Sequence, residues 1–282
     1  MLLFGLLLLA ALAAVGLCLL TGGFGSLAWL WQLPVGFLGS FLLLAALAFA
    51  FLWAACKVVR LDRPQERDSR FYRAVTTLYI DLIIRVARVR VHATGLDKVP
   101  KSGRFLLVSN HTHDVDPAFL LHLLPKSQLA FIAKREVGDM FLVGKLLHKL
   151  LGQFINREND REALKTILTC IRILKEDKAS VAVFPEGGIH DDRLLHPFRP
   201  GVFKIAQKAG VPVVVVTMRN TRFVVGNFLK LRPTDVYVHV LEVIPAEEVT
   251  AVTTVELARR IYSGMARDLG PDLVWQGEEE NA

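Results

Sequence analysis

The segment FLLVSNHTHDVDP (Phe105–Pro117) joins a short apolar run to a polar cluster that holds two histidines and two aspartates. Four consecutive apolar residues, Phe105–Val108, are typical of a central strand that is buried on both faces. The pair Asp116-Pro117 is typical of a helix start, because Asp caps the first turn and Pro fits the first helical position. A strand that leads directly into a helix is the repeating unit of α/β proteins, so this segment predicts that class.

The rest of the chain repeats this alternation of apolar runs and amphipathic segments. Further predicted strands lie in RVRVHATG (88–95), QLAFIA (128–133), GQFINR (152–157), SVAVFPEGG (180–188) and VPVVVVTM (211–218). Helical spacing of apolar residues predicts helices over 160–178 and 253–269. We therefore predict one α/β domain over 85–270, with a mostly parallel sheet flanked by helices, and a tail over 271–282.

The N-terminal region is unusually apolar. No charged side chain occurs between Met1 and Lys57, and the stretches Leu2–Leu20 and Val35–Cys56 are each long enough to cross a hydrocarbon core of roughly 30 Å as a helix. Trp29 and Trp31 lie between them, where Trp is typical of a turn at the far headgroup layer. This predicts a transmembrane hairpin over residues 1–56. A cleaved signal peptide is the alternative, but a basic n-region and a convincing cleavage site are missing.

A basic run follows the second apolar stretch and consists of Lys57, Arg60, Arg63, Arg67, Arg70 and Arg73. Basic residues beside a membrane segment are retained on the cytoplasmic side, so we expect a cell-membrane protein whose α/β domain faces the cytoplasm. Residues 57–84 are predicted to form a basic interfacial segment. Its charges act either only as a stop-transfer flank or also by attracting anionic headgroups.

Charge and cysteine content exclude other classes. The net charge is +7, but it lies mostly beside the membrane segments and no aromatic-basic RNA motif occurs, so we expect no nucleic-acid partner. Cys18, Cys56 and Cys170 have no spacing that predicts disulfides or a zinc site.

The cluster after the first strand has three interpretations. In the first, Asp116 is a simple helix cap. In the second, Asp116 accepts a hydrogen bond from one ring nitrogen of His111 and strengthens the other nitrogen as a base. In the third, His111 and His113 bind a metal. The same spacing occurs at His92 and Asp97, so it is weak evidence alone. Because other polar clusters also follow strands, the catalytic interpretation is favoured.

Those other clusters carry further candidate site residues. Arg157 follows a predicted strand, where a guanidinium binds phosphate bidentately or forms a surface ion pair. Glu186 and Gly187 follow another strand, in a turn that a glycine allows to approach a ligand closely. Glu186 would bond substrate hydroxyls or its neighbouring loop. Arg199 and Lys204 are cations that could assist anion binding, although a solvated helix face explains Lys204 better.

Taken in order, these clusters resemble the glycerolipid acyltransferase family over about residues 85 to 245. The matching blocks are Asn110-His111 with Asp116, Gly152 to Arg157, Phe184 to Gly187, and Val211 to Val213. Each block is short and weak alone, but four blocks in the same order at comparable spacing are specific.

The resemblance implies an O-acyltransferase of phospholipid biosynthesis. It would move a fatty acyl group from acyl-coenzyme A or acyl carrier protein to the free hydroxyl of 1-acyl-glycerol-3-phosphate, giving phosphatidic acid, with no other cofactor and no metal. His111 would take the hydroxyl proton and Asp116 would orient His111. Arg157 would bind the acceptor phosphate, and Glu186 and Gly187 would shape the acceptor site.

Two departures from the family pattern leave the acceptor open. His113 stands where the family commonly has Ser, and Gly188-Ile189-His190 stands where it has a Thr-Arg-Ser run. Arg193 or Arg199 would have to replace the missing arginine.

Three alternative functions remain open at this point. Another lysolipid or glycerol 3-phosphate could be the acceptor. A metal-dependent hydrolase would instead use His111, His113 and Asp116 as ligands. A non-catalytic membrane scaffold would need none of these side chains.

Overall fold

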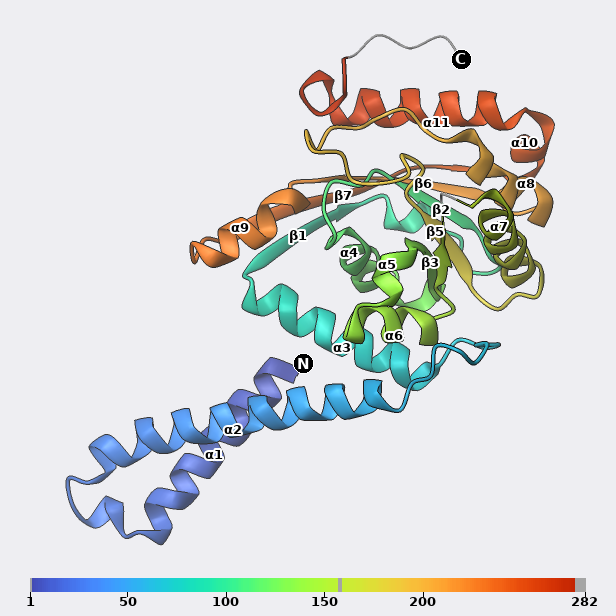
Figure 1. Cartoon of the computed structure of the whole chain (residues 1–282). Helices are drawn as coiled ribbons and strands as arrows, with labels where there is room; N and C mark the ends of the chain where they lie inside the picture. The colour runs from blue at the N-terminus through green and yellow to red at the C-terminus, as the bar shows by residue number, and fades with distance from the viewer. Residues whose placement is uncertain (1, 157–158, 277–282) are drawn as a thin grey trace.

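The computed structural model describes residues 2–156 and 159–276, and it confirms the predicted class (Figure 1). Two long helices, α1 (Leu2–Leu20) and α2 (Trp29–Lys57), form a hairpin that extends away from an α/β domain. The domain is built on one seven-stranded sheet whose strand order is β1-β7-β6-β2-β5-β3-β4.

The sheet is parallel except for one pair. Its strands are β1 (Val89–Thr94), β2 (Leu106–Ser109), β3 (Leu129–Lys134), β4 (Gln153–Ile155), β5 (Ser180–Val183), β6 (Val213–Arg219) and β7 (Thr234–Ile244). Only β6 and β7 pair in the antiparallel sense among these strands. The sequence predicted β1 to β6 but missed β7. The strand β7 alternates buried residues with more exposed ones, as β1 also does, whereas every residue of β2 and β5 is buried.

Helices cover both faces of the sheet (Figure 1). One face carries α7 (Asp160–Lys175), α8 (Lys204–Ala209), α10 (Ala246–Ala251) and α11 (Thr254–Leu269). The other carries α3 (Arg70–Val86), α4 (Asp116–Leu123), α5 (Arg135–Gly138) and α6 (Phe141–Lys149), while α9 (Val224–Leu229) projects from one side. Short 3-10 helices lie at Gly23–Gly25 (η1), Leu96–Lys98 (η2), Pro125–Ser127 (η3), Pro200–Phe203 (η4), Thr221–Phe223 (η5) and Pro271–Leu273 (η6).

Burial on both faces of the sheet explains why residues 105–108, at the start of β2, are all apolar. Leu106 and Val108 pack in the core under α7, α8 and α11, whereas Phe105 and Leu107 pack in the core under α3 and α4. Each of these side chains is almost fully buried. Burial on both faces fixes β2 at the centre of the sheet and therefore fixes the position of the loop that follows it.

The hairpin helices pass the length and composition test for membrane spans. Leu2–Leu20 has a mean hydropathy of 2.8 and Trp29–Lys57 one of 2.4, with only 22% and 11% of the most apolar window buried against the protein. A core helix of a soluble domain would be mostly buried, so these helices expose their apolar side chains to something else.

The turn of the hairpin is shorter than expected. The sequence placed Trp29 and Trp31 in the turn and began the second apolar stretch at Val35, but α2 begins at Trp29. Pro34 lies inside α2, where neighbouring helices can accommodate the single lost backbone hydrogen bond. The turn is confined to residues 21–28.

The segment predicted as basic and interfacial largely forms α3, which belongs to the domain core. Ile80 and Ile84 of α3 are buried against the sheet. Arg73, from the basic run, is paired with Asp68 at 2.6 Å and is almost fully buried. It therefore has a structural role and does not meet lipid headgroups.

Two tyrosines of α3 attach the domain to α2. Tyr72 Oη donates to the backbone oxygen of Ala55 at 2.8 Å, and Tyr79 Oη donates to that of Ala48 at 2.5 Å. These hydrogen bonds fix the direction of the hairpin relative to the domain.

The first part of the predicted tail is also attached. Leu195 N donates to Leu273 O at 2.9 Å, Trp275 N donates to Leu195 O at 3.1 Å, and the ring of Trp275 stacks on His196. Residues up to 276 thus pack on the loop after β5, and residues 277–282 lie outside the described part.

Candidate active site

The predicted contact between His111 and Asp116 is present. Nδ1 of His111 lies 2.9 Å from Oδ2 of Asp116, whose side chain is fully buried. The imidazole stacks on Phe184 at the end of β5, with ring centroids 4.0 Å apart. Because Nδ1 faces the carboxylate, the ring keeps Nε2 for an external group. The side chain of His111 is 15% exposed, so the ring is partly accessible from solvent.

Asp116 does more than orient His111. Its Oδ2 also accepts hydrogen bonds from the backbone N–H groups of Thr112 at 2.7 Å and His113 at 2.9 Å. The capping interpretation is wrong in detail, since Val115 occupies the N-cap position and Asp116 is the first helical residue. Its carboxylate reaches back and closes the loop between β2 and α4. One oxygen therefore holds both the imidazole and the loop that carries it.

Glu186 connects this loop to a second one. Its Oε1 accepts from His111 N at 2.7 Å and its Oε2 accepts from His196 N at 3.0 Å. Glu186 is almost fully buried, and burial raises the pKa of its carboxyl group to about 8. Of the two roles expected for Glu186, the structure shows bonding to the neighbouring loops. Both oxygens face backbone donors, so Glu186 positions His111 through the main chain.

Gly187 meets the steric requirement that the sequence predicted. Its φ is +85°, and a Cβ added there would lie 2.5 Å from Nε of Arg199. The group that approaches Gly187 closely is thus the side chain of Arg199, and only glycine fits beneath it. Arg157 falls outside the described residues, and its role remains a prediction.

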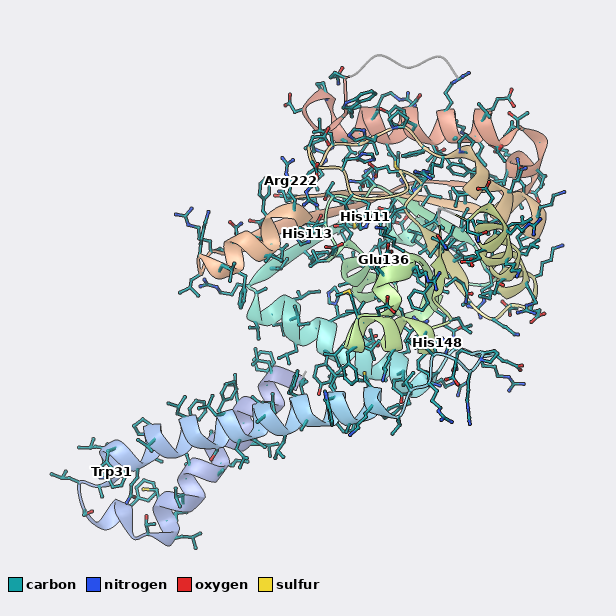
Figure 2. The ribbon with its side chains drawn as sticks, viewed as in Figure 1. Trp31, His111, His113, Glu136, His148 and Arg222 are labelled. Carbon is teal, nitrogen blue, oxygen red and sulfur yellow. The ribbon has the colours of Figure 1, made fainter. Side chains whose placement is uncertain are left out.

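Three arginines line a small pocket beside the loop of His111. They are Arg193, Arg219 and Arg222, and the wall also includes Asn110, Thr112 and Asn220. Nη1 of Arg193 donates to the backbone oxygen of Thr112 at 3.1 Å. Figure 2 shows Arg222 on the same side of the domain as His111 and His113. Nη2 of Arg219 lies 3.8 Å from Oδ2 of Asp268, so a carboxylate already offsets one of the three positive charges. Guanidinium groups bind anions such as a phosphate.

Sequence reasoning identified only part of this pocket. It named Arg193 as one of two candidates for the missing arginine, and the structure brings Arg193, not Arg199, into the pocket. It missed Arg219 and Arg222. Their signal was available, because both follow the apolar run of β6, whose end lies beside that of β2.

The remaining histidines do not assemble with His111. His113 accepts a hydrogen bond at Nδ1 from Val115 N within its own loop, at 3.3 Å. Across residues 2–156 and 159–276, no three His, Cys, Asp or Glu side chains gather closely enough to hold a metal ion. His92, the second match to the His-x4-Asp spacing, pairs with Asp235 at 2.8 Å and not with Asp97.

Asn110 stabilises the backbone next to His111. Its Nδ2 donates to Met218 O at 2.9 Å, and its Oδ1 accepts from Met218 N at 2.7 Å. The buried amide therefore bridges the ends of β2 and β6. This fixes the backbone directly before His111.

Comparisons with known proteins agree with this geometry. A family model described as Acyltransferase matches residues 90–219. The chain is 26% identical over 162 residues to a 1-acyl-sn-glycerol-3-phosphate acyltransferase of Borreliella burgdorferi, covering 57% of this chain and 64% of that protein. It is 26% identical over 222 residues to the protein of the same name from Limnanthes douglasii, covering 78% and 77%.

A human relative and a solved structure extend these matches. The human 1-acyl-sn-glycerol-3-phosphate acyltransferase alpha is 29% identical over 178 residues, covering 63% of this chain and 62% of that protein. The chain thus spans less than two thirds of the bacterial and human relatives. The crystal structure of the 1-acyl-sn-glycerophosphate acyltransferase of Thermotoga maritima shares the fold, with a TM-score of 0.57, 22% identity, and coverage of 78% of this chain and 86% of that one.

Proposed function

Residues 90–219 belong to the acyltransferase family, and from this premise we propose that the protein is a 1-acylglycerol-3-phosphate O-acyltransferase. It transfers a fatty acyl group from an acyl thioester to the free hydroxyl of the acceptor and gives phosphatidic acid. The observation that carries the proposal is the hydrogen-bonded pair of His111 and Asp116 at the end of β2. The names of the relatives support the choice of acceptor.

In the proposed reaction, Nε2 of His111 takes the proton of the acceptor hydroxyl as its oxygen attacks the thioester carbonyl carbon. The tetrahedral intermediate then expels the thiolate, which receives the proton from His111. Asp116 holds the ring in one tautomer and stabilises the imidazolium. General base catalysis of this kind contributes about 10²- to 10⁴-fold to the rate.

The transfer is direct in this mechanism, without an acyl-enzyme. Cys170 is fully buried in the core under α7, and burial raises the pKa of its thiol to about 12, so it remains protonated. Ser109, two residues before His111, is also fully buried and belongs to β2. Neither side chain is available as a nucleophile.

The arginine pocket supports an anionic acceptor. Arg193, Arg219 and Arg222 present positive charge close to Thr112, the residue that follows His111. We propose that the acceptor phosphate binds in this pocket. Arg157, which the family resemblance also assigns to the phosphate, remains a predicted contributor. Glycerol 3-phosphate carries the same phosphate monoester, so the pocket favours acceptors with this more highly charged group over neutral lysolipids and over zwitterionic lysophospholipids, whose phosphate is a diester.

The hairpin supports a membrane location. We propose that α1 and α2 cross the cell membrane and hold the domain on its cytoplasmic side, where acyl-coenzyme A or acyl carrier protein supplies the acyl group. No further cofactor is proposed. The exposed apolar surface of both helices and the basic run after α2 support this arrangement.

The test is acyl transfer by the detergent-purified full chain, with product identified by mass spectrometry. Both donor types are offered to lysophosphatidic acid, other lysolipids and glycerol 3-phosphate. We expect phosphatidic acid from lysophosphatidic acid, and loss of product in His111→Ala but not in the matched control His92→Ala. Equal activity in His111→Ala would overturn the mechanism. Loss of activity with a chelator would favour the metal-dependent hydrolase instead.

A further inference from the structure

A short projection between β6 and β7 exposes a cluster of large apolar side chains. We define the α9 projection as residues Arg222–Arg232, which include α9 and its flanking turns. Leu229 and Leu231 are each 75% exposed, and Phe223, Val225 and Phe228 are also exposed. Single exposed apolar residues are ordinary, but five within one short projection indicate an interaction surface for a lipid bilayer or another protein.

The charges of the α9 projection favour a lipid bilayer as the partner. Arg222, Lys230 and Arg232 accompany the apolar residues, and no acidic residue occurs from Asn220 to Thr234. Apolar tips flanked by basic side chains are typical of elements that lie in the headgroup layer of an anionic membrane. A water-exposed loop would have no reason to combine these two features.

The backbone of the projection gives independent support. Leu231 has a φ of +56°, a conformation in which a side chain costs roughly 1–2 kcal/mol and glycine is the usual residue. Leu231 N donates to Phe228 O at 3.0 Å and Arg232 N donates to Asn227 O at 2.8 Å, the pattern that closes a helix end. Since Leu231 is also largely exposed, the domain gains no packing from it. Its side chain is therefore available for a contact outside the domain.

The position of the projection completes the argument. In Figure 1, α9 extends from the α/β domain toward the same side as the hairpin. At its root, Thr221 Oγ1 lies 2.8 Å from Thr112 Oγ1, and Arg222 lines the arginine pocket. The projection therefore connects the side facing the hairpin with the loop that carries His111.

We propose that the α9 projection inserts its apolar tip into an anionic lipid surface and gives the domain a second membrane contact beside the active site. The hairpin holds the domain through α3, whose Tyr72 and Tyr79 bond to α2. The α9 projection adds a second point of attachment, next to the loop that carries His111. This inference concerns the surface on which the domain rests and does not depend on the acyl-transfer reaction.

The test places an environment-sensitive fluorophore on Leu229→Cys in the full chain. The protein is reconstituted into vesicles of phosphatidylcholine with phosphatidylglycerol, with and without lipids that carry a quencher on the acyl chain. The matched control is Leu168→Cys, an exposed leucine on α7. Cys18, Cys56 and Cys170 are buried, so the unsubstituted protein measures background labelling.

We expect the label at position 229 to shift its emission to the blue and to lose intensity with the quencher lipids, while the label at 168 does neither. High salt or vesicles of phosphatidylcholine alone should weaken the effect at 229. Equal behaviour of the two labels would overturn the proposal. A blue shift without quenching would also overturn it, because a protein surface or a second copy would then cover the projection. Since fluorescence needs no turnover, a failed acyl-transfer assay leaves this test intact.

Discussion

Glu186 is a buried acid that acts on the reaction only through the main chain. Its two oxygens accept hydrogen bonds from the backbone N–H groups of His111 and His196. Burial raises the pKa of the carboxyl group from 4.5 to about 8, so the native protein retains a proton that the unfolded chain releases. The stability that this contributes is complete below pH 4.5 and is lost as the pH rises toward 8.

The first prediction follows from this titration. We expect the unfolding temperature of the full chain in detergent to fall between pH 5 and pH 8, a window set by the raised pKa of Glu186, and Glu186→Gln to flatten the slope. The glutamine side chain is neutral at every pH, but its NH₂ group faces one of the two backbone N–H donors and cannot accept a hydrogen bond from it. It should therefore cost about 1–3 kcal/mol of stability at the acid end. Thermal unfolding followed by circular dichroism measures both effects.

The control for this prediction is Glu247→Gln, which changes an exposed glutamate on α10. It should leave the slope as it is in the unsubstituted protein. If Glu186→Gln also retained the slope, a group other than Glu186 would be responsible.

The site residues differ in how far the sequence could predict them. The pairing of His111 with Asp116 was predictable, because both lie in one short loop and the apolar run before it identified a strand end. The hydrogen bond that His111 N donates to Glu186 was not predictable, because it joins loops that follow two different strands and depends on β2 lying beside β5. Arg219 and Arg222 follow an apolar run that the sequence shows, but that this run lies beside β2 is known only from the strand order.

The end of α9 contains a residue, Leu231, whose backbone conformation lowers stability while its side chain serves the proposed membrane contact. Leu231 occupies a left-handed position at which glycine would remove roughly 1–2 kcal/mol of backbone strain. Glycine also adds about 0.5–1 kcal/mol of entropy cost on folding. We therefore expect Leu231→Gly to raise the free energy of unfolding by up to about 1 kcal/mol in detergent. The same change should reduce lipid quenching of a label at position 229.

The matched variant is Lys230→Gly, one residue earlier, where φ is −91°. Glycine relieves no strain there and should destabilise the protein slightly. A loss of stability in Leu231→Gly comparable to that in Lys230→Gly would show that the left-handed position is not strained.

Helices and strands were predictable from the sequence where their hydrophobic pattern was uninterrupted. The helix α7 and the strands β1 to β6 follow from apolar runs or helical spacing in the sequence. The strand β7 was missed although Val236, Val238 and Val240 alternate with more exposed residues in the same way as Val89, Val91 and Ala93 of β1. The start of α2 was missed because Trp29, Trp31 and Pro34 are typical of a turn, whereas the structure places all three in the first turns of α2 with exposed side chains.

For the molecule as a whole, the direction of insertion is the central question. We expect an impermeant maleimide to modify Ser26→Cys in intact cells, because Ser26 lies in the exposed turn of the hairpin. Arg63→Cys, in the exposed loop after α2, should react only after the cells are permeabilised. Modification is measured by the mass shift of the purified protein, with the unsubstituted chain as the background control.

Two outcomes would contradict this arrangement. Modification of Arg63→Cys alone in intact cells would place the domain outside. If neither variant reacted until permeabilisation, the hairpin would enter the membrane without crossing it, and both ends would face the cytoplasm.

The strand order also has a consequence for biosynthesis. β1 is made soon after the hairpin, but its partner in the sheet is β7, whose pairing begins with Val89 opposite Thr234. Because the chain emerges from the ribosome in order, the proposed anchor enters the bilayer while β1 is still unpaired. A nascent chain that stalls before Thr234 would leave both β1 and β6 as open edges, which invite pairing with other chains. In the proposed arrangement the chain is therefore anchored before its sheet is complete, and the domain closes at the membrane surface.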